Sequence, residues 1–423
     1  MLAVLLPLVL AITACGGNSA KQDGKPAGSG SSTVEETQSG GGREKVTLTA
    51  FLFNMDKREA LEETFKQFTE AHPNITVDLL VNDQDYYTVL KAKIAAKQVP
   101  DIVMGEYGDL YELGQAGHIL DLAGEPFVGN YSDTIRAQIT TPEGHVYGVP
   151  LDVSGMGMYY NKDLLKKAGY DAFPKTQSEL AALVDALKKE GIVPFAVSAA
   201  DGWTLAHMLF TAIAGTTDDV KALAESVKSG GSLVSDRLVK AFDTLDLIYG
   251  NADPQASTNN YNASLSLLAQ GKAAMLQQGY WAYSSILSVD PDVNIGMAAI
   301  PYSDNPEDAR LGVNVNVSYA ISSESKHQEE AKQLLAWLTS PEGNQIANEL
   351  MKQIPAIPDV KVSSNPVADD ILSYVGSGKV VPWSQVLMNG ATRVAAEEIM
   401  QKYYFGKIGA TEAIDELAAN WAK

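Results

Sequence analysis

Between residues 46 and 104 the chain alternates between short apolar runs and segments with a helical spacing, and this alternation restricts the fold more than any other feature. Leu61, Phe65 and Phe68 follow one another at spacings of four and three, which places them on one face of a helix. The other predicted elements here are strands at 46–53, 75–79 and 101–104 and a helix at 86–97. A strand-helix-strand-helix-strand order predicts a parallel sheet with right-handed crossovers.

The pattern begins again after residue 153. Asn161 and Ser178 each precede a helical segment and are predicted to be its N-cap, because a side-chain oxygen there accepts from free backbone N–H groups. Residues 203–284 are predicted to be largely helical. The other predicted elements are strands at 193–197, 293–300 and 313–321 and helices at 326–338, from Pro341, at 392–403 and at 411–422.

Cys15 is the only cysteine and ends an apolar run that begins at Leu2. The run is too short to span a bilayer, which takes about 20 helical residues. The pattern Ile12-Thr-Ala-Cys15 resembles a bacterial lipobox, whose cysteine receives a diacylglyceryl group and becomes the new N-terminus. Residues 1–15 are therefore predicted to be a lipoprotein signal peptide with Cys15 as the lipidation site, and residues 16–43 a flexible, Gly- and Ser-rich tether. In the alternative, an ordinary cleaved signal peptide, the cysteine has no role.

Composition excludes several classes of protein. No cysteine follows position 15, so disulfides and cysteine metal sites are excluded from residues 44–423. The net charge of −20 argues against binding of nucleic acid and against docking on an anionic membrane surface. The chain has 45% hydrophobic residues, and residues 44–423 are long and apolar enough to form two domains.

Four segments, taken together and in this order, carry a family resemblance. They are residues 100–107 with 113–122, residues 148–152 with 158–165, residues 268–281, and residues 319–323 with 330–343. The first reads Pro-Asp-Ile-Val-Met-Gly-Glu-Tyr and the third ends in Gly-Tyr-Trp. Their order and content resemble the extracellular solute-binding proteins (family 1) of carbohydrate ABC importers, which include maltose-binding protein.

The resemblance implies an α/β fold of the type II periplasmic-binding-protein kind, with two lobes, each a sheet flanked by helices, joined by a hinge. The chain is expected to cross the hinge near residues 152–155, 312–316 and 364–369. The first lobe would then comprise residues 44–152 and 313–366, and the second residues 153–312 and 367–423. A ligand would lie between the lobes, at the carboxyl ends of the sheets.

A neutral sugar presents hydroxyl groups on its rim and C–H groups on its faces. Its receptor therefore needs carboxylates and amides for the rim and flat aromatic rings for the faces. Trp281 matches the stacking platform of the family and is the strongest single candidate. The predicted ligand-binding residues are Asn54, Asp56, Glu106, Tyr107, Asp152, Asp201, Trp203, Tyr280, Trp281, Asn314, Asn316 and Trp383.

Most of these candidates also have a structural interpretation that the sequence leaves open. Asn54 and Asp56 are suited to capping the following helix, and Asp152 to orienting the hinge. Asn314 and Asn316 alternate along a predicted strand, so they share one face, which is either the cleft or a polar sheet edge. Trp203 is either a ligand contact or a core residue. Trp337 and Trp421 lie among apolar neighbours at helical spacing and are predicted to be core.

Motifs for catalysis and for cofactors are absent from the sequence. The five histidines lack metal-ligand spacing, and no nucleophile elbow or phosphate-binding loop occurs, so an ATPase must be another subunit. No cofactor, metal or catalytic residue is predicted. The sequence predicts a monomeric, lipid-anchored receptor outside the cytoplasmic membrane of a Gram-positive bacterium, which hands a sugar or oligosaccharide to a membrane permease.

Two alternative functions stay open. An extracellular enzyme acting on glycans needs only two carboxylates about 5 to 10 Å apart in space, which a sequence cannot exclude. A binder of iron or another metal ion is suggested by Tyr159 and Tyr160, although neighbours on a strand point to opposite faces.

Overall fold

The computed structural model describes residues 45–53, 55–82, 86–358, 360–363 and 365–422. The predictions for residues 1–43, including Cys15, and for Asn54 lie outside this part of the chain. None of the helices in the described ranges has the length and the continuous apolar character that crossing a bilayer requires.

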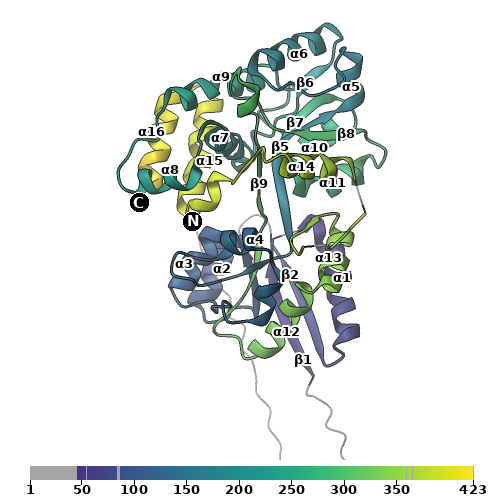
Figure 1. The fold of residues 1–423 in the computed structure, drawn as a ribbon, viewed down its shortest axis with the longest axis vertical. Helices are drawn as coiled ribbons and strands as arrows, with labels where there is room; N and C mark the ends of the chain where they lie inside the picture. The colour runs from purple at the N-terminus through teal and green to yellow at the C-terminus, as the bar shows by residue number, and fades with distance from the viewer. Residues whose placement is uncertain (1–44, 54, 83–85, 359, 364, 423) are drawn as a thin grey trace, which may run out of the picture. The chain divides into compact units, whose positions relative to one another are not determined.

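The first sheet has the strand order β2-β1-β3-β10-β4. β1 runs parallel to β2 and β3, which confirms the predicted parallel unit, whereas β10 runs antiparallel to β3 and β4. Its strands are β1 (Val46–Leu52), β2 (Ile75–Val81), β3 (Ile102–Gly105), β4 (Val149–Pro150) and β10 (Ser318–Ile321). Its helices are α1 (Arg58–Ala71), α2 (Tyr86–Ala95), α3 (Tyr107–Gln115), α4 (Asp133–Ile139), α12 (Gln328–Leu338) and α13 (Pro341–Met351), with α1 beside α13 (Figure 1).

Helix α1 packs as its spacing predicts. Leu61, Phe65 and Phe68 are all buried in the core under the first sheet. Trp337 of α12 is half-buried, and its ring centroid lies 5.7 Å from that of Phe68. Trp421 is buried in the core of the second lobe, where its Nε1 donates to the carbonyl oxygen of Leu387 at 3.2 Å.

The second sheet has the strand order β12-β9-β5-β7-β6, and β8 and β11 also pair with β5. Its strands are β5 (Asp152–Asn161), β6 (Val193–Phe195), β7 (Ala273–Gly279), β8 (Ile295–Ala298), β9 (Leu311–Val315), β11 (Ile354–Pro355) and β12 (Val380–Val381). Its helices are α5 (Lys162–Lys167), α6 (Gln177–Lys189), α7 (Gly202–Thr216), α8 (Val220–Lys228), α9 (Asp236–Gly250), α10 (Tyr261–Ala269), α11 (Tyr283–Val289), α14 (Pro366–Gly376), α15 (Gly390–Tyr404) and α16 (Ala410–Trp421). Two sheets, each flanked by helices, confirm the predicted two-lobed α/β class.

One strand was missed and one local prediction is wrong. The stretch predicted to be largely helical is so, with α7 to α10 inside it, but it also contains β7, which is buried along its whole length between β5 and β6. The N-cap of α6 is Thr176 rather than Ser178, because Thr176 forms a capping box with Glu179. Asn161 caps α5 as predicted, since its side chain accepts from the N–H groups of Asp163 and Leu164.

The single strand predicted at 313–321 is two strands in different sheets. β9 ends at Val315 and pairs with β5 of the second sheet, whereas β10 begins at Ser318 and pairs with β3 of the first. Residues 316 and 317 therefore carry the chain from one lobe to the other. β11 lies inside the range predicted for the first lobe, yet it pairs with β5 of the second sheet. The exact division of the chain between the lobes remains a prediction.

Candidate ligand-binding site

The first lobe presents two polar turns at one edge of its sheet. β1 and β3 run parallel, so the turns that follow them, the 3-10 turn η1 (Met55–Lys57) and the start of α3, lie at the same edge. Asp56 is exposed in η1, and its Oδ2 accepts a hydrogen bond from Ser285 Oγ of α11, in the second lobe, at 3.2 Å. Glu106 is the residue immediately before α3.

The second lobe presents aromatic side chains at the ends of its own elements. Trp203 lies in the first turn of α7, Trp281 lies in the 3-10 turn η3 (Tyr280–Ala282) directly after β7, and Trp383 precedes the 3-10 turn η5 (Ser384–Leu387). Trp203 and Trp281 are half-buried, whereas Trp383 is buried.

These three tryptophans belong to one continuous row of rings. The row runs Tyr261, Trp203, His207, Trp281, Trp383, with centroid separations of 5.1, 5.2, 5.4 and 5.7 Å in that order. Burial, with a contribution from the Arg393 charge, lowers the pKa of His207 to about 3, so this ring is neutral at physiological pH. The row combines apolar ring faces with two buried ring nitrogens, His207 Nδ1 and Trp383 Nε1, that have no hydrogen-bond partner among the described residues.

Trp281 takes its position only because residue 279 is glycine. A Cβ atom at Gly279 would lie 2.0 Å from the Trp281 ring, far inside van der Waals contact. The indole therefore lies against the end of β7, and any larger residue at 279 would displace it.

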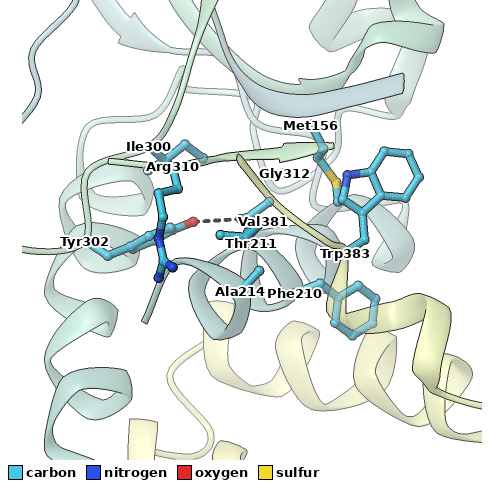
Figure 2. Close-up of a pocket in the computed structure, with 10 residues that line it drawn as sticks. All are labelled: Met156, Phe210, Thr211, Ala214, Ile300, Tyr302, Arg310, Gly312, Val381 and Trp383. Atoms are coloured by element: carbon cyan, nitrogen blue, oxygen red, sulfur yellow. Dashed lines mark hydrogen bonds between the residues drawn. The ribbon is translucent and has the colours of Figure 1, made fainter. Parts of the chain in front are cut away.

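Figure 2 shows a separate pocket next to Trp383. Tyr302 and Thr211 line it and are joined through their hydroxyl groups at 2.7 Å, and Arg310 lies beside Tyr302. The ten residues that line this pocket lie in elements of the second lobe or in the segments next to them. Trp383 belongs both to the lining of this pocket and to the aromatic row.

A buried charge cluster joins the two lobes. Arg393 of α15 forms ion pairs with Asp109 of α3 and, at 3.3 Å, with Glu106. Its guanidinium carbon lies 6.0 Å from the ring centroid of Tyr87 on α2. The α15 side of the second lobe and the α3 side of the first are therefore in direct contact.

The predicted hinge residue Asp152 is buried where β5 begins. Burial raises its pKa to about 6, although the charge of the buried Lys57 and a hydrogen bond from Asn316 both oppose the shift. Asn316 Nδ2 donates to Asp152 Oδ2 at 3.0 Å, and the backbone of Asn316 donates to the Asp152 carbonyl at 3.1 Å. Asp152 and Asn316 thus bind each other across the crossing, which favours the structural interpretation of both.

Two other candidates do not face a cleft in this structure. Tyr280 is fully buried, its ring is stacked on Tyr283 at 5.5 Å, and its hydroxyl accepts from Asn365 Nδ2 at 2.8 Å. Asn314 is buried and faces Ser154 across the β5–β9 pair. The alternation that was expected to place Asn314 and Asn316 on one face fails because β9 ends at Val315.

The remaining candidates stay near the site. Asp201 Oδ2 accepts the backbone N–H of Tyr261 at 2.6 Å, which places this carboxylate at the beginning of the aromatic row. Tyr107 is half-buried and lines a second pocket with Tyr111 and Tyr147 in the first lobe.

Comparison with known proteins decides the family. The family model described as "Bacterial extracellular solute-binding protein" matches residues 54–345. This chain belongs to that family. The match begins after β1, at residue 54, and ends inside α13, so it covers strands of both sheets and most of the elements that carry the site.

Several curated relatives of this extracellular solute-binding protein are named for sugars. The multiple sugar-binding protein of Streptococcus mutans is 25% identical over 348 residues, which cover 80% of this chain and 82% of the relative. The maltooligosaccharide ABC transporter solute-binding lipoprotein of Streptococcus pneumoniae is 25% identical over 384 residues, which cover 86% of this chain and 82% of the relative. The names of these two relatives thus describe binding proteins and not enzymes.

Solved structures share the fold. The solute-binding protein RafE in complex with raffinose superposes with a TM-score of 0.78 at 24% identity and covers 89% of this chain and 99% of its own. A chitin oligosaccharide binding protein superposes with a TM-score of 0.79 at 23% identity and covers 89% of this chain and 98% of its own. These likenesses confirm the type II solute-binding fold.

Several residues at the site were missed by reasoning from the sequence. Asp109 lies in the first turn of α3, three positions after Glu106, which precedes that helix, so the helical period would have found it. His207 lies four positions after Trp203 and was open to the same argument. Arg393 gave no local signal, because its partner Asp109 lies 284 residues away along the chain and Glu106 is more distant still.

The metal-ion alternative gains no support from the tyrosine pair. Tyr159 is buried in one core cluster and Tyr160 packs against another, so the two side chains lie on opposite faces of β5. The described part of the chain holds no group of three or more His, Cys, Asp or Glu side chains placed to bind a metal.

Glu397 yields a pH-dependent prediction. Burial raises the pKa of its carboxyl to about 7; the Arg393 charge opposes this shift and the Asp201 charge adds to it. In the unfolded chain the group titrates near 4.5. The folded state therefore holds an extra proton between about pH 4.5 and pH 7, and the free energy of unfolding falls across that interval. Glu397→Gln should therefore raise the free energy of unfolding by only about 1–2 kcal/mol at pH 8, because solvent screens part of the effect of this partly exposed carboxyl. At pH 4 the substitution should leave the free energy of unfolding unchanged.

Urea unfolding of the variant and the wild type at both pH values measures this effect. Glu398→Gln is the matched control, because Glu398 is the adjacent, exposed residue of the same helix. An equal gain at pH 8 in both variants would contradict the assignment of the effect to the buried carboxyl.

Proposed function

We propose that this protein captures a neutral sugar or oligosaccharide between its two lobes and delivers it to the permease subunits of an ABC importer. The observation that carries this proposal is the aromatic row from Tyr261 to Trp383, at whose beginning lies the carboxylate of Asp201. Aromatic faces suit the C–H faces of a pyranose, and carboxylates suit its hydroxyl groups.

Charge at the site favours a neutral ligand. Asp201 lies at the beginning of the aromatic row and interacts electrostatically with Glu397, and Glu106 with Asp109 outnumber the single guanidinium of Arg393 in the cluster between the lobes. An anionic ligand would meet a surplus of like charge, whereas hydroxyl groups find acceptors. The names of the relatives, which refer to multiple sugars and maltooligosaccharides, support the same class.

Closure of the lobes supplies the mechanism. Ligand bound to one lobe favours the closed state, because only that state adds the contacts of the other lobe. The crossings at residues 316 and 317 and at the start of β5 are the segments about which the lobes would move. No covalent step is needed, and the closed surface is what a permease would recognise.

The anchor and the assembly belong to the same proposal. Cys15 would carry a diacylglyceryl group, and residues 16–43 would tether the binding unit to the outer face of the cytoplasmic membrane of a Gram-positive cell. The protein would act as a monomer, because a single chain provides both walls of the site.

A thermal-shift screen of the purified protein against neutral mono- and oligosaccharides tests the function. A sugar present at 100 times its Kd should add about 2.7 kcal/mol to the free energy of unfolding and raise the Tm. Chromatography of the same mixtures separates this function from glycan hydrolysis. Unchanged sugar with a raised Tm supports transport; product released at many turnovers per protein, or no Tm shift with any sugar, would refute it.

A further inference from the structure

Arg393 is placed to act on the ligand site through other residues. Its side chain is only 12% exposed, and its guanidinium is shared by three partners. Nη2 hydrogen-bonds to Asp109 Oδ2, Nη1 donates to the backbone oxygen of Met388 at 3.2 Å, and Nη1 lies 3.3 Å from Glu106 Oε2. A planar guanidinium can serve several acceptors in fixed directions, which an ammonium group cannot.

Glu106 keeps a free acceptor in this arrangement. Its Oε2 is buried and, although it pairs electrostatically with Arg393, it accepts no hydrogen bond within the described part of the chain. Burial raises the pKa of Glu106, and the Arg393 charge opposes that shift. A buried carboxylate oxygen without a donor is costly, so a ligand hydroxyl that supplies one gains strongly.

The cluster depends on the two lobes being close together. Asp109 and Glu106 belong to the first lobe, whereas Arg393 and Met388 belong to the second. A Cβ atom at Gly390, in the first turn of α15, would lie 3.0 Å from Asp109 Oδ1, so the backbone of α15 lies close to the Asp109 side chain at this point. Opening the hinge would separate Arg393 from both carboxylates.

We propose that Arg393 is a positioning residue of the sugar site, which joins the lobes through Asp109 and holds Glu106 so that its Oε2 accepts a hydrogen bond from a ligand hydroxyl. This role rests on the proposed function, since it requires a hydroxylated ligand. It links closure to binding, because the same guanidinium completes the contact between the lobes and orients the acceptor.

The test compares variants by isothermal titration with the neutral sugar that gives the largest thermal shift with the wild type. Arg393→Ala should raise the Kd at least tenfold while the circular dichroism spectrum is retained. Arg237→Ala is the matched control, because Arg237 of α9 has a side chain that is 45% exposed and pairs only with acidic residues of its own lobe. Its Kd should stay within twofold of the wild type.

Small-angle scattering provides a readout that a merely structural role would not change. Addition of sugar should reduce the radius of gyration of the wild type and of Arg237→Ala, and should reduce that of Arg393→Ala less at equal saturation. If Arg393→Ala does not fold, Glu106→Ala takes its place, and the proposal again requires a loss of at least tenfold.

The outcomes separate this proposal from the proposed function. If the wild type binds no sugar, the proposed function fails first. If the wild type binds sugar and a folded Arg393→Ala or Glu106→Ala protein binds it within twofold as well, the positioning role is refuted while the proposed function stands.

Discussion

Trp281→Ala is expected to weaken sugar binding by about 5- to 150-fold, or ~1–3 kcal/mol, while the fold is retained. The indole is half-buried and lies within the aromatic row, with ring centroids 5.4 Å from His207 and 5.7 Å from Trp383. Its removal deletes a ring face on which a pyranose would stack. Isothermal titration of the variant with the best neutral sugar measures the loss.

Trp337→Ala provides the comparison for this variant. Trp337 is also half-buried, but it packs on Phe68 in the first lobe and lies outside the aromatic row. The Trp337→Ala substitution should lower the Tm without changing the Kd for the sugar. Equal affinity of Trp281→Ala and wild type would remove Trp281 from the site.

Gly108→Ala is expected to weaken binding at least tenfold by holding the lobes apart. A Cβ atom at position 108 would lie 2.5 Å from the carbonyl oxygen of Met388, which belongs to the other lobe. The obstacle is backbone, so it cannot rotate away as a side chain would. Alanine favours the helix α3 by about 1 kcal/mol relative to glycine, so the first lobe itself should not be destabilised.

Gly250→Ala is the control for this steric effect. Gly250 ends α9, and a Cβ atom there would meet no other atom within 4 Å. Titration and small-angle scattering of both variants in the presence of sugar separate the two cases. A Gly108→Ala protein that binds and contracts like the wild type would show that closure does not bring α3 against residue 388.

Much of the fold was predictable because it depends on local periodicity. The spacing of Leu61, Phe65 and Phe68 defines a buried helix face, and the alternation of strands and helices from residue 46 to residue 104 yields a parallel unit. β7 was missed because its residues, Ala-Ala-Met-Leu-Gln-Gln-Gly, show neither strand alternation nor many β-branched residues, and burial between two neighbours defines it instead.

The candidate site was proposed on two kinds of signal. Glu106 was proposed because it follows a predicted strand, and residues at the carboxyl end of a strand in such sheets face a common edge. Trp281 was proposed because it matches the stacking platform of the family. Tyr280, adjacent to Trp281, was proposed on the same ground but is buried against Tyr283. In a 3-10 turn, with three residues per turn, neighbouring side chains point in different directions, and the sequence does not show which of two neighbouring aromatic residues points outward.

The sequence by itself determined the class of fold, the family and the aromatic and acidic character of the site, because these follow from local spacing and from the types of residue present. Only the tertiary structure decided which side chains meet. Arg393 reaches Asp109, and Gly108 touches Met388, through contacts between segments that are far apart along the chain. Such pairs carry no local signal, since they exist only after two separately folded sheets are brought together by the hinge.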